Sequence, residues 1–227
     1  MQNLKYKNKS FKISCDGGAA TGKSTGAKLI SKKYNLKFLS SGLLYRYASY
    51  LLMSYDPKNK ITFLQKKFKN LNYKILNKKE LYSQKISENS AKIAKINKIR
   101  KILKKYQLGF AKKYNKCCIE GRDISTKILP KSDLKFFFIC NLDTASIRRY
   151  RELKKNDKNL RLKDVKKALR IRNITDAKRK NSPLLKHRDS VVIDTGKLDK
   201  RAMIAKMSKY VEKALLNLNE NRARTKK

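Results

Sequence analysis

Short hydrophobic runs alternate along the chain with longer segments in which hydrophobic residues recur every three or four positions. Two of the runs, residues 117–120 and 135–139, are almost continuously hydrophobic, which is typical of strands covered on both faces. Strands that alternate with helices predict a parallel sheet with helices on both of its faces. We expect five strands, at residues 11–15, 37–39, 117–120, 135–139 and 190–193.

Helical spacing is found between and after the expected strands. In the last helix, Ile204, Met207, Val211 and Leu215 lie three or four positions apart and would share one face. The other helices are expected after the first strand, where Ala27, Ile30 and Tyr34 recur, at residues 43–55, 144–153 and 162–179, and around Ile99, Leu103, Tyr106 and Phe110.

The 227 residues are enough for one α/β domain with a single core and small appendages. We expect that core in residues 11–56 and 96–217. Residues from about 57 to 95 are rich in lysine and asparagine and weakly patterned, which suits a small peripheral insert. Residues from about 154 to 162 form a charged loop between two helices. The prediction is therefore a single domain over residues 1–227.

The composition is strongly basic, with 60 Lys and Arg against 17 Asp and Glu and a formal net charge of +43. Such a charge attracts nucleotides, RNA and acidic membrane surfaces alike. The basic residues occur in ones and twos along nearly every helical segment, so we interpret them as solvated charge from a biased composition. A dedicated nucleic-acid surface is the alternative interpretation.

Cysteine usage and hydropathy favour the cytoplasm. Cys15, Cys117, Cys118 and Cys140 form no Cys-x-x-Cys pair and lie in or beside expected strands, which predicts buried, reduced thiols. The longest hydrophobic stretch, residues 43–55, is too short to span a bilayer. We expect a cytoplasmic protein without a membrane partner.

The segment after the first strand carries the strongest chemical signal. Residues 17–24 match the pattern G-x-x-x-x-G-K-[ST] between a strand and a helix, the context that favours a phosphate-binding P-loop. Backbone N–H groups of such a loop and the helix N-terminus bind phosphate oxygens. Lys23 can reach the β- and γ-phosphates, and the Ser24 hydroxyl can bind Mg²⁺. The expected ATP-binding residues are Gly17, Gly18, Ala19, Ala20, Thr21, Gly22, Lys23, Ser24 and Thr25.

Cationic side chains near three further strand ends indicate a second phosphate. Arg46 follows the second strand, Arg122 follows the third, and Arg148 and Arg149 lie in the helix after the fourth. A P-loop alone is compatible with GTPases, ATPases and small-molecule kinases. Several separate arginines favour a kinase, because a donor triphosphate and an acceptor phosphate must be held from both sides of the transferring group.

One expected helix carries Val165, Leu169, Arg172, Asp176 and Arg179 at spacings of four, three, four and three. The change from hydrophobic to charged residues along this stripe predicts that the same face passes from the core to a cleft. The alternative is a solvated helix on which an Arg–Asp pair has no functional role.

Four motifs, in this order, resemble the bacterial cytidylate kinase family: D-G-x-A-x-x-G-K-S-T, S-G-x-x-Y-R, G-R-D-I-x-T and R-x-x-x-D-x-x-R-x-x-x-P-L. The resemblance runs from residue 11 to about 215 and is interrupted at residues 57–88. It implies a three-layer P-loop fold with a five-stranded parallel sheet. It also implies that the insert at about 57–95 binds the nucleoside monophosphate and that residues 154–162 form a lid.

The same resemblance implies transfer of the γ-phosphoryl group of ATP to CMP and dCMP, with Mg²⁺ at Ser24. Lys23, Arg148, Arg172 and Arg179 would act on the transferring group. The family usually has Asp where Ser40 stands and Arg-Asp where Arg172 and Asn173 stand. The acceptor-binding residues that it implies are Ser41, Arg46, Arg100, Arg122, Asp123, Arg172 and Asp176, with Arg100 and Asp123 at the cytosine and Asp176 at the ribose.

Two alternatives to a CMP kinase stay open at this point. The first is a kinase for UMP or for another small acceptor. The second is a basic nucleic-acid-binding protein whose P-loop is an accessory ATPase. Our expectation is a monomer that binds small-molecule nucleotides and no specific nucleic acid.

Overall fold

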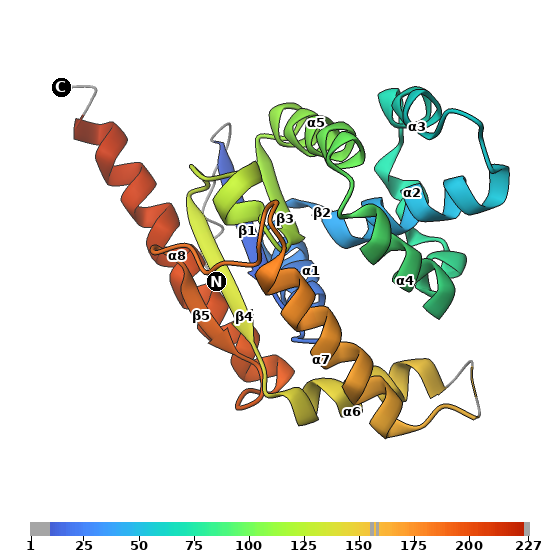
Figure 1. Ribbon diagram of the computed structural model, residues 1–227. Helices are drawn as coiled ribbons and strands as arrows, with labels where there is room; N and C mark the ends of the chain where they lie inside the picture. The colour runs from blue at the N-terminus through green and yellow to red at the C-terminus, as the bar shows by residue number, and fades with distance from the viewer. Residues whose placement is uncertain (1–9, 155–156, 158, 225–227) are drawn as a thin grey trace.

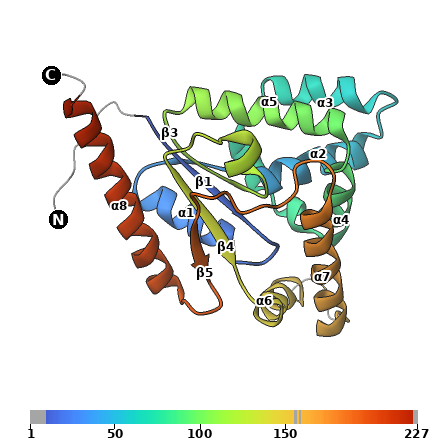
Figure 2. The same ribbon diagram turned by 60° about the vertical axis from the view of Figure 1, so that its left-hand side comes forward.

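The computed structural model describes residues 10–154, 157 and 159–224 of the chain. Five parallel strands form one sheet in the order β2-β3-β1-β4-β5, and helices cover both of its faces (Figures 1 and 2). The predicted sheet is therefore confirmed, with each strand at its expected place. The strands are β1 (Phe11–Gly17), β2 (Lys37–Ser40), β3 (Lys116–Gly121), β4 (Leu134–Ile139) and β5 (Val191–Asp194).

The strand order brings the carboxyl ends of β1, β2 and β3 side by side. Asp16 near the end of β1 is paired with Gly121, and Ser40 at the end of β2 is paired with Glu120. Ligands of open α/β sheets bind outside the carboxyl ends of the strands, where the strand order reverses. Segments that are far apart in sequence therefore meet at one edge, next to the expected P-loop.

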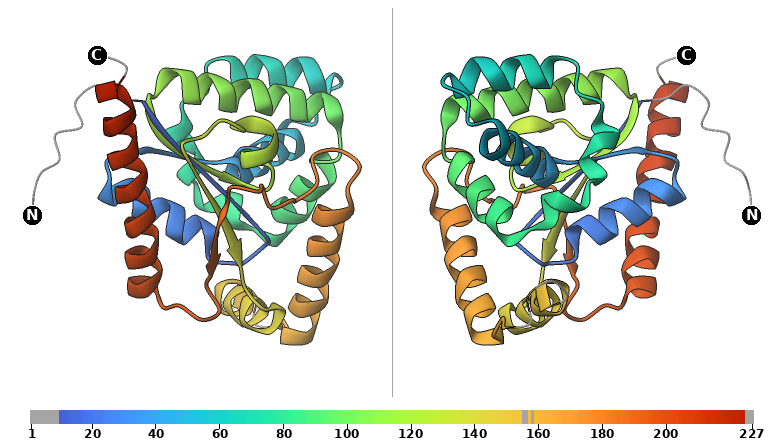
Figure 3. Two further views of the ribbon diagram at one scale, coloured as in Figure 1. Left: turned by 90° about the vertical axis from the view of Figure 1, so that its left-hand side faces the viewer. Right: turned by 90° about the vertical axis from the view of Figure 1, so that its right-hand side faces the viewer.

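One face of the sheet is covered by α1 (Lys23–Lys33) and α8 (Lys200–Arg224), and Figure 3 shows α8 along one side of the molecule. The other face is covered by α2 (Ser41–Tyr55) and α5 (Asn97–Lys113). Cys117 packs in the core beneath α2 and α5, whereas its neighbour Cys118 packs in the core beneath α1 and α8. Successive strand residues are thus buried on opposite faces, as the continuous hydrophobic run predicted.

The insert is more regular than its weak pattern predicted. Asn59 and Ser83 are N-caps whose side chains accept hydrogen bonds from backbone N–H groups of the helices that follow. Leu64, Phe68 and Ile93 are buried against the core formed with α2 and α5. The elements of this segment are α3 (Lys60–Lys69), the 3₁₀ turns η1 (Tyr73–Asn77) and η2 (Lys79–Tyr82), and α4 (Gln84–Ile93).

Two further helices, α6 (Leu142–Lys154) and α7 (Leu162–Lys178), form a hairpin beside the P-loop (Figure 1). A small hydrophobic cluster packs this hairpin against the loop through Ala19, Ala145 and Leu169. Of the expected lid at residues 154–162, residues 155, 156 and 158 lie outside the described part of the chain. After β3, one π-helical turn, η3 (Ile124–Ile128), precedes β4.

All four cysteines are free, and three of them are buried. Cys140, which follows β4, is only partly buried, which corrects the expectation that every thiol is inside the core. Within the described residues, no helix has the length and hydrophobicity that crossing a membrane requires.

Candidate active site

The P-loop starts in the last residue of β1 and ends at α1. Gly17 passes so close to β4 that an added Cβ would lie 2.5 Å from the carbonyl oxygen of Phe138. Gly22 precedes α1 with a φ of 74°, in the left-handed region that favours glycine. These two glycines allow the loop to turn around the N-terminus of α1. There, free backbone N–H groups and the helix dipole favour a phosphate.

Lys23 and Glu120 form a buried ion pair, and Ser40 donates a hydrogen bond to the same carboxylate. Burial lowers the pKa of Lys23, and the negative charge of Glu120 partly offsets this decrease. Burial alone would raise the pKa of Glu120, but Lys23 and Ser40 hold it below its usual value. A carboxylate at the end of β3 is thus shared by the P-loop lysine and by the end of β2.

A cavity of about 360 Å³ lies over the P-loop. It is lined by the loop itself, from Gly18 to Thr25, which includes Lys23, and by Glu120. Positive side chains from α2, α6, α7 and the segment after β3 complete the lining. They are Arg46, Arg122, Arg148, Arg149 and Arg172.

The insert holds two of these arginines in place. The Ser87 hydroxyl in α4 lies 3.2 Å from Nη2 of Arg46 and 3.2 Å from Nη1 of Arg172, both of which donate to it. Burial, reinforced by the positive charge of Arg122, lowers the pKa of Arg172 to about 10. The Nε of Arg172 is buried and has no hydrogen-bond partner among the described residues. Such a cluster favours an anionic ligand.

A second cavity of about 390 Å³ lies between the insert and the α6–α7 hairpin. Arg149, Leu169 and Arg172 line both this cavity and the one over the P-loop. Arg149 is ion-paired with Glu152 at 2.7 Å, and its side chain is only 13% exposed. The two cavities therefore meet at a pair of arginines.

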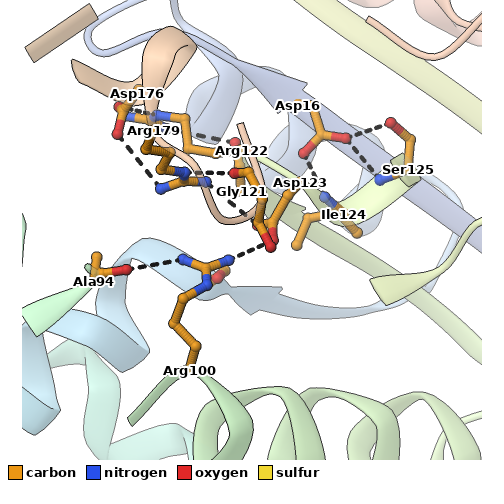
Figure 4. Close-up of polar contacts among 12 residues, drawn as sticks. Asp16, Ala94, Arg100, Gly121, Arg122, Asp123, Ile124, Ser125, Asp176 and Arg179 are labelled. Atoms are coloured by element: carbon orange, nitrogen blue, oxygen red, sulfur yellow. Dashed lines mark hydrogen bonds and ion pairs between the residues drawn. The ribbon is translucent and has the colours of Figure 1, made fainter. Parts of the chain in front are cut away.

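A network of alternating charges extends from the second cavity, which Asp176 and Arg179 line (Figure 4). Nη2 of Arg100 lies 2.5 Å from one oxygen of Asp123, and Arg179 lies 3.9 Å from the other. Arg179 is also 3.6 Å from Asp176, which accepts a 2.9 Å hydrogen bond from Nε of Arg122. Burial would raise the pKa of Asp176, but Arg122 holds it below its usual value.

The structure brings most of the expected site residues together. The P-loop, Arg46, Arg122 and Arg172 line the first cavity, and Asp176 lines the second. Arg100 and Asp123 contact each other and line neither cavity.

Three further expected residues have these positions. Arg179, which is expected at the transferring group, lines the second cavity and lies near the carboxylates of Asp123 and Asp176. Arg148 lines the first cavity, but Nη1 and Nη2 donate to Thr195 at 2.9 and 2.8 Å. Ser41 is buried, accepts a 2.6 Å hydrogen bond from Gln107 and lines neither cavity.

Sequence reasoning missed some of the site. Arg149 was one of the cations that indicated a second phosphate but was not an expected site residue, because the rotation of a helix about its axis decides which of two adjacent side chains reaches the second cavity. Ser87 had no signal, because it lies inside α4, whose N-cap is Ser83. Asn173 accepts a 3.2 Å hydrogen bond from the backbone N–H of Ala19, so α7 reaches the P-loop at the position where the motif departs from its usual pattern.

The site can hold a divalent cation only with help from a ligand. No group of three or more His, Cys, Asp or Glu side chains that could bind a metal occurs among the described residues. Ser24 is exposed and lines the first cavity next to Lys23. Its hydroxyl is a hard oxygen donor, and Mg²⁺ is commonly bound by one or two protein groups together with substrate phosphates. The residues present fit that arrangement.

A P-loop cavity that opens into a second cavity suits a P-loop kinase, because the donor and the acceptor need separate sites that meet at the transferring group. Two solved structures share the fold: TT1252 from Thermus thermophilus, with a TM-score of 0.52 at 14% identity over 92% of this chain and 99% of that one, and shikimate kinase from Bacteroides thetaiotaomicron, with a TM-score of 0.50 at 10% identity over 89% and 98%. At these identities they establish the fold alone.

Sequence comparison identifies the family. The model of the family described as cytidylate kinase matches residues 13–213. A cytidylate kinase from Bartonella tribocorum is 35% identical over 209 residues, which cover 90% of this chain and 95% of that protein. Another from Rickettsia canadensis is 32% identical over 220 residues, which cover 93% and 99%. The chain belongs to the cytidylate kinase family.

Proposed function

We propose that the protein transfers the γ-phosphoryl group of ATP to CMP, and to dCMP, and so forms ADP and CDP or dCDP. The observation that carries this proposal is the junction of the two cavities at Arg149 and Arg172. A triphosphate on the P-loop would direct its γ-phosphate toward this junction. An acceptor nucleotide in the second cavity would direct its phosphate toward the same junction from the opposite side. Family membership supports the same reaction.

The chemistry needs no general base, because the acceptor phosphate is largely ionised near neutral pH. The protein's contribution is to align the two phosphates and to neutralise the charge between them. Lys23 would leave Glu120 for the β- and γ-phosphates of the donor. Arg149 and Arg172 would contact the transferring group, whose charge is spread over its oxygens in the transition state.

Mg²⁺ would be held by the Ser24 hydroxyl and the donor phosphates. The ion would supply neutralisation of part of the phosphate charge. On the acceptor side, Arg46, Arg122 and Arg172 would bind the phosphate, and Asp176 the ribose. Cytosine would be read by Arg100 and Asp123, with Arg179 beside them.

Each part of the chain would have a separate role in this reaction. The core at residues 11–56 and 96–217 would carry the P-loop and the sheet, and the insert at about 57–95 would enclose the acceptor. Residues of about 154–162, which connect α6 to α7, would act as a lid that excludes water. The lid would limit the hydrolysis of ATP. We further propose a cytoplasmic monomer that binds nucleotides and no specific nucleic acid.

The test is a panel of nucleoside monophosphates and small carboxylic acids, each offered with ATP and Mg²⁺ while ADP release is followed. We expect CMP and dCMP to support the fastest release, and ATP alone to support very little. ADP release that requires RNA, or that is equal with and without an acceptor, would favour an accessory ATPase over a kinase. Preference for a carboxylic acid would identify a different small acceptor.

A further inference from the structure

Asp16 is a buried carboxylate that the proposed reaction does not use. It is the penultimate residue of β1, its side chain is 0% exposed, and Gly17 of the P-loop follows it directly. Burial of an ionisable group is costly unless hydrogen bonds or an opposite charge compensate for it. The described residues include no ion-pair partner for Asp16, so its compensation must come from hydrogen bonds.

Those hydrogen bonds all come from the segment that follows β3 (Figure 4). One oxygen of Asp16 accepts from the backbone N–H of Ile124 at 2.8 Å. The other accepts from the backbone N–H of Ser125 at 2.7 Å and from its hydroxyl at 2.6 Å. Asp16 thus caps the start of η3 from more than a hundred residues away in sequence, and it satisfies N–H groups that the turn itself leaves free.

The two residues between β3 and η3 are both proposed to bind the acceptor. Gly121 is fixed by its pairing with β1, and Ile124 is fixed by Asp16, so only Arg122 and Asp123 lie between two anchored points. Gly121 also packs closely on Ile124, because an added Cβ would lie 2.7 Å from a methyl carbon of that side chain. The backbone positions of Arg122 and Asp123 are therefore set at both ends.

We propose that Asp16 is a positioning residue for the acceptor site. It holds the segment that carries Arg122 and Asp123 at a fixed distance from the P-loop. A single side chain, adjacent in sequence to Gly17, would then set the spacing between the donor phosphates and the residues that bind the acceptor. Misplacement of binding groups by about 1 Å can cost roughly 100-fold in rate. The inference rests on the proposed function only for the choice of substrate.

The test compares Asp16→Asn with a control on the same strand. The Asn variant keeps the size of the side chain, but its NH₂ group cannot accept, so at least one of the three hydrogen bonds is lost. Ser14→Ala is the control. Ser14 is also 0% exposed in β1, and its hydroxyl lies 2.9 Å from that of Ser132, outside the acceptor segment. Ser125→Ala removes a single donor and covers the case in which the Asn variant does not fold.

We expect Asp16→Asn to raise KM for CMP by roughly 10- to 100-fold while KM for ATP changes by less than about threefold. Ser125→Ala should raise KM for CMP by a smaller factor than Asp16→Asn does, and it should change KM for ATP even less. Ser14→Ala should lower the melting temperature without changing KM for CMP. The inference is overturned if KM for CMP is unchanged in folded Asp16→Asn and Ser125→Ala, or if KM for ATP and for CMP rise equally.

Amide hydrogen exchange separates this inference from the proposed function, because it requires no substrate. Protection of the Ile124 and Ser125 amides should fall in Asp16→Asn and stay at the wild-type level in Ser14→Ala. If wild type phosphorylated no nucleoside monophosphate, the proposed function would be rejected. Hydrogen exchange would still test whether Asp16 holds the segment that follows β3. Unchanged protection in Asp16→Asn would reject that hold even in an active CMP kinase.

Discussion

Lys23 of the P-loop and Glu120 of β3 form an ion pair in which the two side chains are only 6% and 2% exposed. The pair lies in the lining of the cavity that would receive ATP. We propose that Lys23 binds the donor phosphates during the reaction, and that this ion pair is its arrangement before ATP binds. The carboxylate keeps the lysine charged and near the loop despite the cost of burial.

Lys23→Ala should therefore have two separable effects. Loss of charge at the transferring group should lower kcat by about 100- to 1,000-fold or more. Loss of the partner of Glu120 should also destabilise the fold by about 3–5 kcal/mol, because one buried charge is left alone. Urea denaturation and steady-state kinetics measure the two effects on the same preparation.

The double variant Lys23→Ala, Glu120→Gln is the control for Lys23→Ala. It removes the unpaired charge and should recover much of the lost stability while activity stays low. Activity of the single variant within about tenfold of wild type, a change of about 1.4 kcal/mol in the barrier, would contradict the assigned role.

Arg149 and Arg148 are adjacent in α6 but should respond differently to substitution. Arg149 lies at the junction of the cavities, so Arg149→Ala should lower kcat by about 100-fold or more. Arg148 donates to Thr195, whose hydroxyl in turn donates to the Thr21 carbonyl at 2.9 Å. Arg148→Ala should therefore act mainly through the P-loop, by raising KM for ATP.

Single-turnover kinetics, together with KM for both substrates, distinguish these outcomes. Arg149→Lys should recover little, because an ammonium group cannot reproduce the planar fork of donors. Glu152→Gln removes the partner of Arg149 and keeps the arginine, so its kcat should stay within about threefold of wild type. A larger loss of kcat in Arg148→Ala than in Arg149→Ala would return the catalytic role to Arg148.

The sequence was most informative where structure depends on near neighbours. The strands were predictable from short hydrophobic runs, and the P-loop from one contiguous motif at the end of a strand. The helices of the insert were not predicted: Leu64 and Phe68 in α3 are four positions apart, but one such pair in a lysine- and asparagine-rich segment is too short a pattern to identify a helix. Their burial depends on the surfaces of α2 and α5, which a local pattern cannot include.

Features that depend on distant partners were not accessible. Asp16 stood in a motif, but its hydrogen-bond donors lie 108 and 109 residues further along the chain. The contact of Arg179 with Asp123 likewise joins segments far apart in sequence, whereas its contact with Asp176 is local, only three residues away. Spacing placed Arg179 on the correct stripe of its helix but could not say which of two adjoining cavities that stripe would reach.

Asp16 should also make stability depend on pH. Burial raises the pKa of Asp16 above its usual value of 3.8, the hydrogen bonds from Ser125 and Ile124 oppose that rise, and the charge of Asp123 adds to it. A pKa that is higher in the native than in the unfolded chain contributes stability that is present below 3.8 and is lost as pH rises through the native pKa.

The measurement is the free energy of unfolding of wild type and of Asp16→Asn, from urea denaturation between about pH 4 and about pH 8. Other titrating groups are the same in both proteins, so the difference isolates Asp16. Wild type should lose stability relative to Asp16→Asn as the pH rises through this range. A difference that is constant with pH would show that the carboxyl group titrates with the same pKa in both states.

Base selectivity should depend on Asp123. Cytosine presents an amino donor where uracil presents a carbonyl acceptor, and a carboxylate accepts from the first and repels the second. Arg100, held 2.5 Å from Asp123, can donate to the acceptor edge of cytosine, whereas the protonated N3 of uracil opposes that contact. We expect kcat/KM for CMP to exceed that for UMP by at least about tenfold, or 1.4 kcal/mol.

Asp123→Asn should narrow that preference, because its amide can donate to the uracil carbonyl. Asp176→Asn is the matched control: Asp176 is another carboxylate in the same network, partly buried and paired with Arg122 and Arg179, and it is proposed to bind the ribose that both substrates share. This variant should lower kcat/KM for CMP and UMP by similar factors and leave their ratio unchanged. Equal use of CMP and UMP by wild type, or full selectivity in Asp123→Asn, would refute this account of base recognition. Phosphoryl transfer at the P-loop would stand in either case, because none of its groups reads the base.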